Sequence, residues 1–211
     1  MRSFSIMAVA GLAFMTAFAG CVPESVNPIG KPETAQQDVQ LHGLWVADSS
    51  EGEAQYLHIG AEPDKPLAAG AAAPEAGLMR FWLIGHTTEN GRVANPFGAR
   101  FVVSRVGGGN YASLEVPVDE KDADKPRGWW FIKYQVDQGT LTTWGMDFET
   151  VAKLIDAGKV QGTVERDSQG KFSKALITAP SDQVEAFVQA NSAQLFPDAN
   201  RTSFHKVSTA R

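Results

Sequence analysis

The sequence predicts a mainly β domain of the α+β class, built as an antiparallel β-barrel with two helices packed against it. Ten runs of alternating or β-rich composition support this prediction, and each is bounded by turn residues. Five Trp and twelve Phe can supply the core. The runs cover residues 41–47, 55–59, 78–86, 99–106, 110–116, 129–136, 140–146, 160–166, 173–178 and 203–207. Ten short strands in one domain indicate either a barrel or a sandwich, and we expect the barrel.

Three junctions between these runs have the composition of hairpin turns. They lie at residues 107–110 (GGGN), 137–139 (DQG) and 167–170 (DSQG), and each offers Gly or Asp where a turn needs a positive φ. A longer connection at residues 61–77 is rich in Ala, Pro and Gly, which predicts a low-complexity loop.

Two stretches follow the helical period and are expected to be packing elements. Asp147 is placed to cap the first, which should end near Gly158. The apolar face of this first helix consists of Phe148, Val151, Leu154 and Ile155. The second runs from about Ser181 to Asn191, although Pro180 could equally be its first helical residue. Its apolar positions are Val184, Phe187 and Val188.

The N-terminal residues have the order of an export signal. Arg2 supplies a positive charge, an apolar run covers residues 6–18, and the small pair Ala19-Gly20 precedes Cys21, the only cysteine. The run is shorter than the roughly 20 apolar residues that a membrane-spanning helix needs. We therefore expect residues 1–20 to be a signal peptide.

The segment Ala19-Gly20-Cys21 resembles the lipobox of bacterial lipoproteins, in which the cysteine sulfur receives a diacylglycerol and the preceding peptide is removed. Phe18 stands where that family most often has leucine. The resemblance implies that Cys21 is lipidated and that acyl chains hold the protein to a membrane. The alternative is an ordinary secretory signal cut near Ala19, which would leave Cys21 as an unpaired thiol in an oxidising compartment.

The residue after the cysteine bears on localisation. In the sorting rule of Gram-negative lipoproteins, aspartate at this position retains the protein at the inner membrane, whereas this chain has Val22. The resemblance therefore implies the periplasmic face of the outer membrane. Residues 21–38, with three prolines, are expected to form the lipidated cysteine and a flexible tether. Residues 39–211 are expected to form a single β-rich domain.

Gly43-Leu44-Trp45 at the start of the first strand run resembles the entry motif of lipocalins and other calycins. In that family the tryptophan closes one end of the barrel, and an arginine from the last strand before the helix stacks over it. Residues 173–178 contain no counterpart of this arginine, and their only basic residue is Lys174. More broadly, the chain is similar to exported bacterial lipoproteins of uncharacterised role, a resemblance that implies no catalytic residues.

The sequence offers no constellation typical of an enzyme or a metal site. The four histidines (His42, His58, His86 and His205) lie far apart, whereas metal ligands usually come in closely spaced pairs. No nucleophile motif is present, and the acidic run at 119–124 has the composition of a solvated loop. A net charge of −5 also argues against a nucleic-acid binder. We expect no catalytic residue, no metal and no cofactor, with a hydrolase as the least favoured alternative.

The aromatic run at residues 129–134 (WWFIKY) allows two interpretations. Adjacent strand residues face opposite ways, so Trp129 and Phe131 share one face and Trp130 and Tyr134 the other. The strand is then either buried on both sides, between barrel interior and helix, or part of an apolar pocket with aromatic walls. We nominate as pocket residues Trp82, Trp129, Phe131 and Trp144.

Two non-catalytic functions follow from these predictions. In the first, the barrel binds a small hydrophobic molecule, which requires a cavity of several hundred cubic ångströms lined by Trp and Phe. In the second, the protein is an accessory or assembly factor for another envelope protein, which requires an exposed apolar or edge-strand patch. In both, the lipid anchor makes the membrane a partner.

Overall fold

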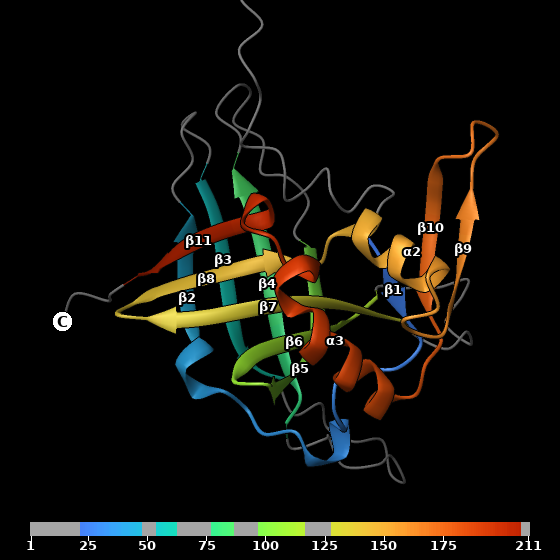
Figure 1. Ribbon diagram of the computed structural model, residues 1–211. Coiled ribbons are helices and arrows are strands. Elements are labelled where there is room, and N and C mark those ends of the chain that lie inside the picture. Colours follow the sequence, from blue (N-terminus) through green and yellow to red (C-terminus); the bar gives the residue numbers. More distant parts are fainter. Residues whose placement is uncertain (1–21, 48–53, 63–76, 87–96, 117–127, 208–211) are drawn as a thin grey trace, which may run out of the picture.

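The computed structural model describes residues 22–47, 54–62, 77–86, 97–116 and 128–207, and its centre is a closed antiparallel barrel (Figure 1). The barrel strands follow in the order β6-β5-β4-β3-β2-β11-β8-β7, and pairing of β6 with β7 closes the ring. These strands are β2 (Gly43–Ala47), β3 (Ala54–Ala61), β4 (Met79–His86), β5 (Phe97–Val106), β6 (Gly109–Glu115), β7 (Trp129–Asp137), β8 (Thr140–Gly145) and β11 (Arg201–Lys206). The mainly β fold with a calycin-like barrel and two helices is therefore confirmed.

Eight of the ten expected strands form the barrel, and the other two lie outside it. The chain leaves the barrel after β8 and makes α2 (Phe148–Asp156), β9 (Gly162–Arg166), β10 (Phe172–Ile177) and α3 (Ser181–Leu195) before it returns as β11. Strand β10 pairs with β9 and, in parallel, with the two-residue β1 (Glu24–Ser25), which also pairs with β7. Strands β9 and β10 therefore lie outside the closed ring.

The three predicted hairpin turns are present, and each contains a residue with a positive φ; in the turn from β9 to β10 it is Gly170, with φ of 78°. Gly107 and Gly108 connect β5 to β6 with φ of 56° and 81°. Gln138 and Gly139 connect β7 to β8 with φ of 45° and 80°. The left-handed region favours glycine because it has no Cβ, which explains where the sequence places its turns.

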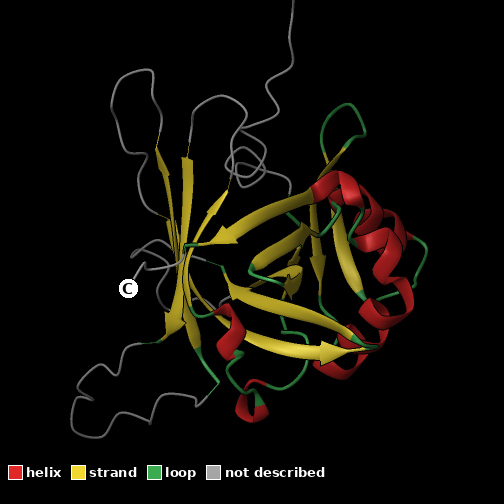
Figure 2. Cartoon of the chain, turned by 90° about the vertical axis from the view of Figure 1, so that its left-hand side faces the viewer, coloured by secondary structure: helices red, strands yellow, loops and turns green. Residues whose placement is uncertain are grey.

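Both helices are present, and α3 is longer than predicted. The Asp147 side chain accepts a hydrogen bond from the backbone N–H of Thr150 at 2.9 Å, so α2 has the expected cap. Helix α3 begins at Ser181, has Pro180 at its N-cap position and continues to the buried Leu195. In Figure 2 the helices gather on one side of the barrel.

Two hydrophobic cores share strand β7. The inner core fills the barrel and includes Tyr134 and Leu141. The outer core lies between the helices and strands β5–β8, and it includes Phe131 and Val184. Strand β7 contributes alternate residues to each, so the interpretation of a strand buried on both sides is confirmed.

Residues 22–42 cross the outer core and one end of the barrel, and we call them the N-terminal strap. Its Ile29 is fully buried, and the Ile29 N–H donates to Ser113 Oγ at 3.0 Å while its carbonyl accepts from Ser104 Oγ at 2.7 Å. Short 3-10 turns follow at Pro32–Thr34 and Val39–Leu41. The hydroxyls of Ser104 and Ser113 and the inter-strand bonds of β1 hold this segment against the domain.

Trp45 lies fully buried at the same end of the barrel. Its indole N–H donates to the carbonyl of Leu41 at 2.8 Å, and Lys206 Nζ lies 5.0 Å from its ring centroid. The basic partner over this tryptophan is thus Lys206 of β11. Lys174, the residue available in the predicted strand, instead lies near Glu165 on the outer sheet.

Candidate functional site

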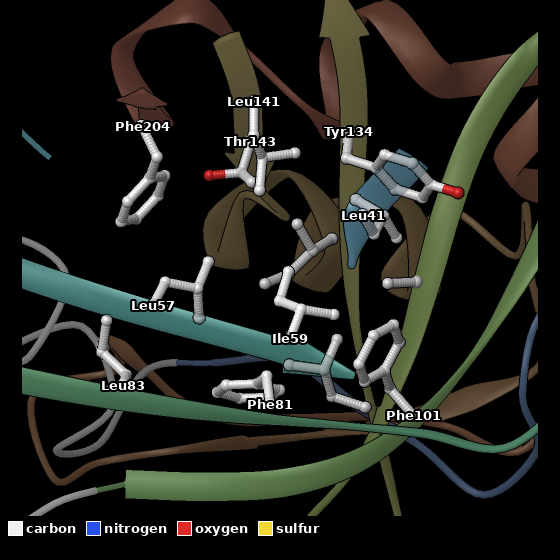
Figure 3. Close-up of a pocket in the computed structure, with 13 residues that line it drawn as sticks. Leu41, Leu57, Ile59, Phe81, Leu83, Phe101, Tyr134, Leu141, Thr143 and Phe204 are labelled. Carbon is white, nitrogen blue, oxygen red and sulfur yellow. The ribbon is translucent and has the colours of Figure 1, made fainter. Parts of the chain in front are cut away.

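The inside of the barrel holds a small apolar cavity of about 60 Å³ (Figure 3). Its wall includes Leu57, Ile59, Phe81, Phe101, Leu141 and Phe204. Pockets that bind drug-sized molecules measure about 300–1,000 Å³. The barrel is therefore filled mostly by its own side chains.

None of the four nominated pocket residues lines this cavity. Phe131 is buried in the outer core, and Trp129 and Trp144 pack against that core. The Trp144 indole N–H donates to Asp198 Oδ1 at 3.0 Å, and Lys133 Nζ lies 5.6 Å from its ring centroid. Trp82 lies on the outside of the barrel and is 42% exposed. The structure thus separates these residues between the outer core and the surface.

The aromatic residue of β7 that does line the cavity is Tyr134. Figure 3 shows its ring against the cavity and its hydroxyl pointing away. The hydroxyl donates to Asp38 Oδ2 at 2.9 Å and so joins β7 to the N-terminal strap. Burial, followed by the negative charge of Asp38, raises the pKa of Tyr134 well above its usual range. The alternation of strand residues predicts that Tyr134 and Phe131 lie on different faces of the strand, but it does not predict which face lines the barrel interior.

The outer surface of β2, β3 and β4 carries a continuous set of apolar side chains. We call it the apolar face and define it as Leu44, Val46, Tyr56, Trp82 and Ile84, with Val207 at its border. Across the strands, Leu44 and Trp82 flank His58, while Val46 and Ile84 flank Tyr56. Val207 lies beside β2 at the border of the apolar face, where its N–H donates to the carbonyl of Leu44 at 2.8 Å.

Side chains of this face are unusually exposed for their types. The exposed fractions of Leu44, Tyr56 and Ile84 are 39%, 38% and 36%. Among the described residues, the outer core takes no member from β2, β3 or β4. Figure 2 agrees, because the helices lie over the opposite side of the barrel. A contiguous exposed apolar surface of this kind marks an interaction site in soluble domains.

Trp82 lies flat on this face because its neighbour on β5 is a glycine. A Cβ at Gly98 would come within 2.5 Å of Trp82 Cε3, so the absence of a side chain is what lets the indole approach the sheet. The guanidinium of Arg80 lies 5.6 Å from the Trp82 ring centroid. The resulting surface is broad and aromatic at its centre.

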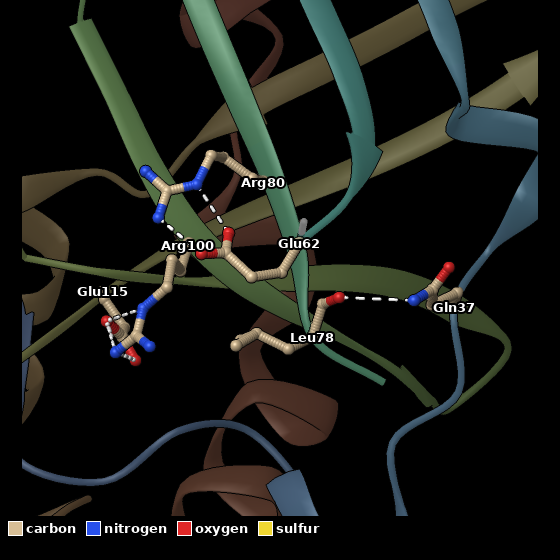
Figure 4. Close-up of polar contacts among 6 residues, drawn as sticks. All are labelled: Gln37, Glu62, Leu78, Arg80, Arg100 and Glu115. Atoms are coloured by element: carbon tan, nitrogen blue, oxygen red, sulfur yellow. Dashed lines mark hydrogen bonds and ion pairs between the residues drawn. The ribbon is translucent and has the colours of Figure 1, made fainter. Parts of the chain in front are cut away.

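Two arginine–glutamate pairs border the apolar face (Figure 4). Arg80 and Arg100 are direct cross-strand neighbours. Arg80 donates to both carboxylate oxygens of Glu62, at 2.5 and 2.6 Å, and Arg100 contacts both oxygens of Glu115. The hydrogen bond to Glu62 is the largest of the influences that raise the pKa of Arg80. Each cation is therefore held in a fixed bidentate geometry.

The described residues offer no metal centre. No group of three or more His, Cys, Asp or Glu side chains in this part of the chain could hold an ion. His58 and His205 are exposed on different strands, and His42 is half-buried at the end of the strap. Cys21, the expected lipidation site, lies outside the described residues.

The comparisons with known proteins give no family. No protein-family model matches the chain, and searches of curated proteins and of solved structures find no match. In the described part of the chain, no helix has both the length and the apolar composition needed to cross a membrane.

Proposed function

We propose that this chain is a non-catalytic accessory protein of the bacterial cell envelope that binds another envelope protein through its apolar face. The observation that carries the proposal is the set of exposed side chains on β2, β3 and β4, centred on Trp82 and Tyr56. Tryptophan, tyrosine and arginine are the residues most enriched among those that dominate binding energy at protein interfaces.

The chemistry of the face favours a protein over a lipid surface as the partner. A bilayer with anionic lipids attracts basic patches, whereas this chain has a net charge of −5. The two arginines at the border are also neutralised by Glu62 and Glu115. An apolar centre with a rim of satisfied polar groups is instead the usual arrangement of a protein interface.

The N-terminal signal completes the proposal. Lipidation at Cys21 would keep the domain at the periplasmic face of the outer membrane, where partner and anchor share one surface. Confinement to a membrane raises the effective concentration of the two proteins, so a face of modest area can suffice. Mass spectrometry of the mature N-terminus tests this part, because a diacylglyceryl group on Cys21 is the expected product.

A second role, binding of a small hydrophobic molecule, is supported by the wholly apolar wall of the barrel cavity. A cavity of about 60 Å³ accommodates only a very small ligand unless side chains move. Native mass spectrometry of the protein from its own envelope distinguishes the roles. A co-purifying small hydrophobic molecule supports the carrier, and its absence supports the accessory protein.

The docking role is tested by photo-crosslinking in intact envelopes, with the reactive residue placed at Ile84. The matched control places it at Val39, which is 70% exposed but lies away from the apolar face. The expected result is one specific adduct from position 84 that Trp82→Ala removes.

The captured protein is then purified and titrated against the full chain. Truncation of a central interface aromatic costs about 2 kcal/mol or more, so Trp82→Ala should weaken binding at least about thirtyfold, while Val39→Ala leaves it unchanged. Equal adducts from both positions, or equal affinities of both variants, would exclude the apolar face as the interface.

A further inference from the structure

A polar trench lies at the end of the barrel, on the other side of Tyr134 from the apolar cavity. Its volume is about 600 Å³, within the range of small-molecule sites. One wall is the N-terminal strap from Gly30 to Asp38, and the opposite wall is the end of β5 with Asn110 of β6. Glu185 of α3 borders it, so three separate parts of the chain surround one hollow.

The walls of this trench are held by specific contacts. Ser104 Oγ donates to the carbonyl of Ile29, which fixes the beginning of the strap against β5. The Tyr134 hydroxyl bonds Asp38 at the other end of the strap. Gly30 has a φ of 75°, and a Cβ there would lie 2.7 Å from Ser104 Oγ, so the strap passes close to β5 before the trench begins. The hollow is therefore built into the domain.

The charges on these walls are opposite in sign and do not pair with each other. Lys31 and Arg105 contribute two cations, and Glu185 contributes a carboxylate. Within the described part of the chain, none of these three side chains forms an ion pair. Asp38, the fourth charged residue, is already engaged by the Tyr134 hydroxyl and the Gln40 N–H.

We propose that the trench binds a small zwitterion, whose anionic group contacts Arg105 and Lys31 and whose ammonium group contacts Glu185. Opposite charges that line one hollow without meeting leave room for a ligand that carries both complementary charges. Charge-assisted hydrogen bonds to guanidinium and carboxylate groups are the strongest that side chains make. The amides of Gln36 and Asn110 add neutral donors and acceptors along the same walls. This site is separate from the apolar face, so it does not depend on the proposed docking role.

The test uses the full chain in a neutral detergent and three probes: O-phosphoethanolamine, inorganic phosphate and ethanolamine. Calorimetric titration should find O-phosphoethanolamine bound at least about tenfold more tightly than phosphate or ethanolamine, because only the zwitterion contacts both the cations and the carboxylate of the trench. Backbone resonances of Arg105 and Asn110 should shift on titration. No binding of O-phosphoethanolamine at millimolar concentration would overturn the proposal, as would equal affinities for the zwitterion and phosphate.

Paired variants separate the two halves of the site. Arg105→Gln should weaken both phosphate and the zwitterion about tenfold, whereas Glu185→Gln should reduce the zwitterion to the affinity of phosphate alone. The controls are Arg201→Gln on β11 and Asp182→Asn on α3, which are exposed and lie outside the trench. Equal losses from the control variants would show general charge effects and refute the site.

The same chemistry occurs free in solution and in phosphoethanolamine lipid headgroups. Nanodiscs with and without phosphatidylethanolamine distinguish the sources, because a headgroup ligand shifts the Arg105 resonance only when that lipid is present. A shift with the soluble probe alone identifies a soluble ligand. If neither the lipid nor the soluble probe shifts the Arg105 resonance, the proposal is refuted.

Discussion

Replacing Glu115 by glutamine should destabilise the barrel far more than replacing an exposed glutamate. Glu115 is 13% exposed and accepts three contacts of 2.7–2.9 Å from Arg100. Glutamine keeps one acceptor, turns an amide N–H₂ group toward the guanidinium, and leaves the charge of Arg100 unneutralised at this position beside the charge of Arg80. Hydrogen bonds to charged groups contribute about 1.5–3 kcal/mol, and Arg100 is one-third exposed, so we expect a loss of about 2 kcal/mol.

The matched control is Glu149→Gln, which removes an exposed i,i+4 pair with Lys153 on α2. Such pairs contribute about 0.3–0.5 kcal/mol. Urea denaturation of both variants and the wild type measures the free energies of unfolding. The Glu115→Gln deficit should also shrink at high salt, because salt screens the repulsion between the two arginines. Equal losses for the two variants, at any salt concentration, would contradict the account of the Arg–Glu pairs.

Three further changes test other parts of the structure. Gly98→Ala should lift the Trp82 ring off the sheet, which an NMR shift of the Trp82 indole N–H would report; an unmoved resonance would show that the glycine is not needed. Tyr134→Phe removes the bond to Asp38 and should cost about 1 kcal/mol at neutral pH. The folded-state pKa of Tyr134 is raised, so the stability that this group contributes to the wild type is fully present below about pH 10 and is lost as the pH rises further. The difference in free energy of unfolding between the wild type and Tyr134→Phe should therefore narrow above about pH 10. A gap that stays constant in alkaline urea titrations would contradict this. Asp147→Ala should cost about 1 kcal/mol through the lost cap of α2, read as a lower urea midpoint, and no change would show that the cap contributes nothing.

The sequence predicted local structure well because alternation and turn chemistry are local signals. Leu57 and Ile59 alternate with Tyr56 and His58, which defines both the strand β3 and its inner face. The assignment of strands to sheets is not local. Strands β9 and β10 have ordinary strand composition, and nothing within them indicates that β9 pairs with β10 alone and that β10 also pairs with the two-residue β1.

The candidate site was harder to predict because both faces of β7 are apolar. Trp129 and Phe131 have the composition of a ligand pocket, yet the barrel interior receives Ile132 and Tyr134 instead. Only the pairing of β7 with its neighbours decides which face is inside, and pairing is a long-range property. The apolar face was missed for a similar reason, because a lone Trp82 among strand residues does not reveal that the helices of the described residues pack on the other side of the barrel.

The long excursion between β8 and β11 means that the ring can close only after α2, β9, β10 and α3 have been synthesised. Strand β11 supplies the last barrel hydrogen bonds, to β2 on one side and to β8 on the other. While residues 201–206 are missing, two strand edges remain open, and open edges are templates for aggregation. A nascent chain that has not yet exposed residues 201–206 should therefore depend on chaperones, although of the described buried hydrophobic residues it lacks Phe204 alone.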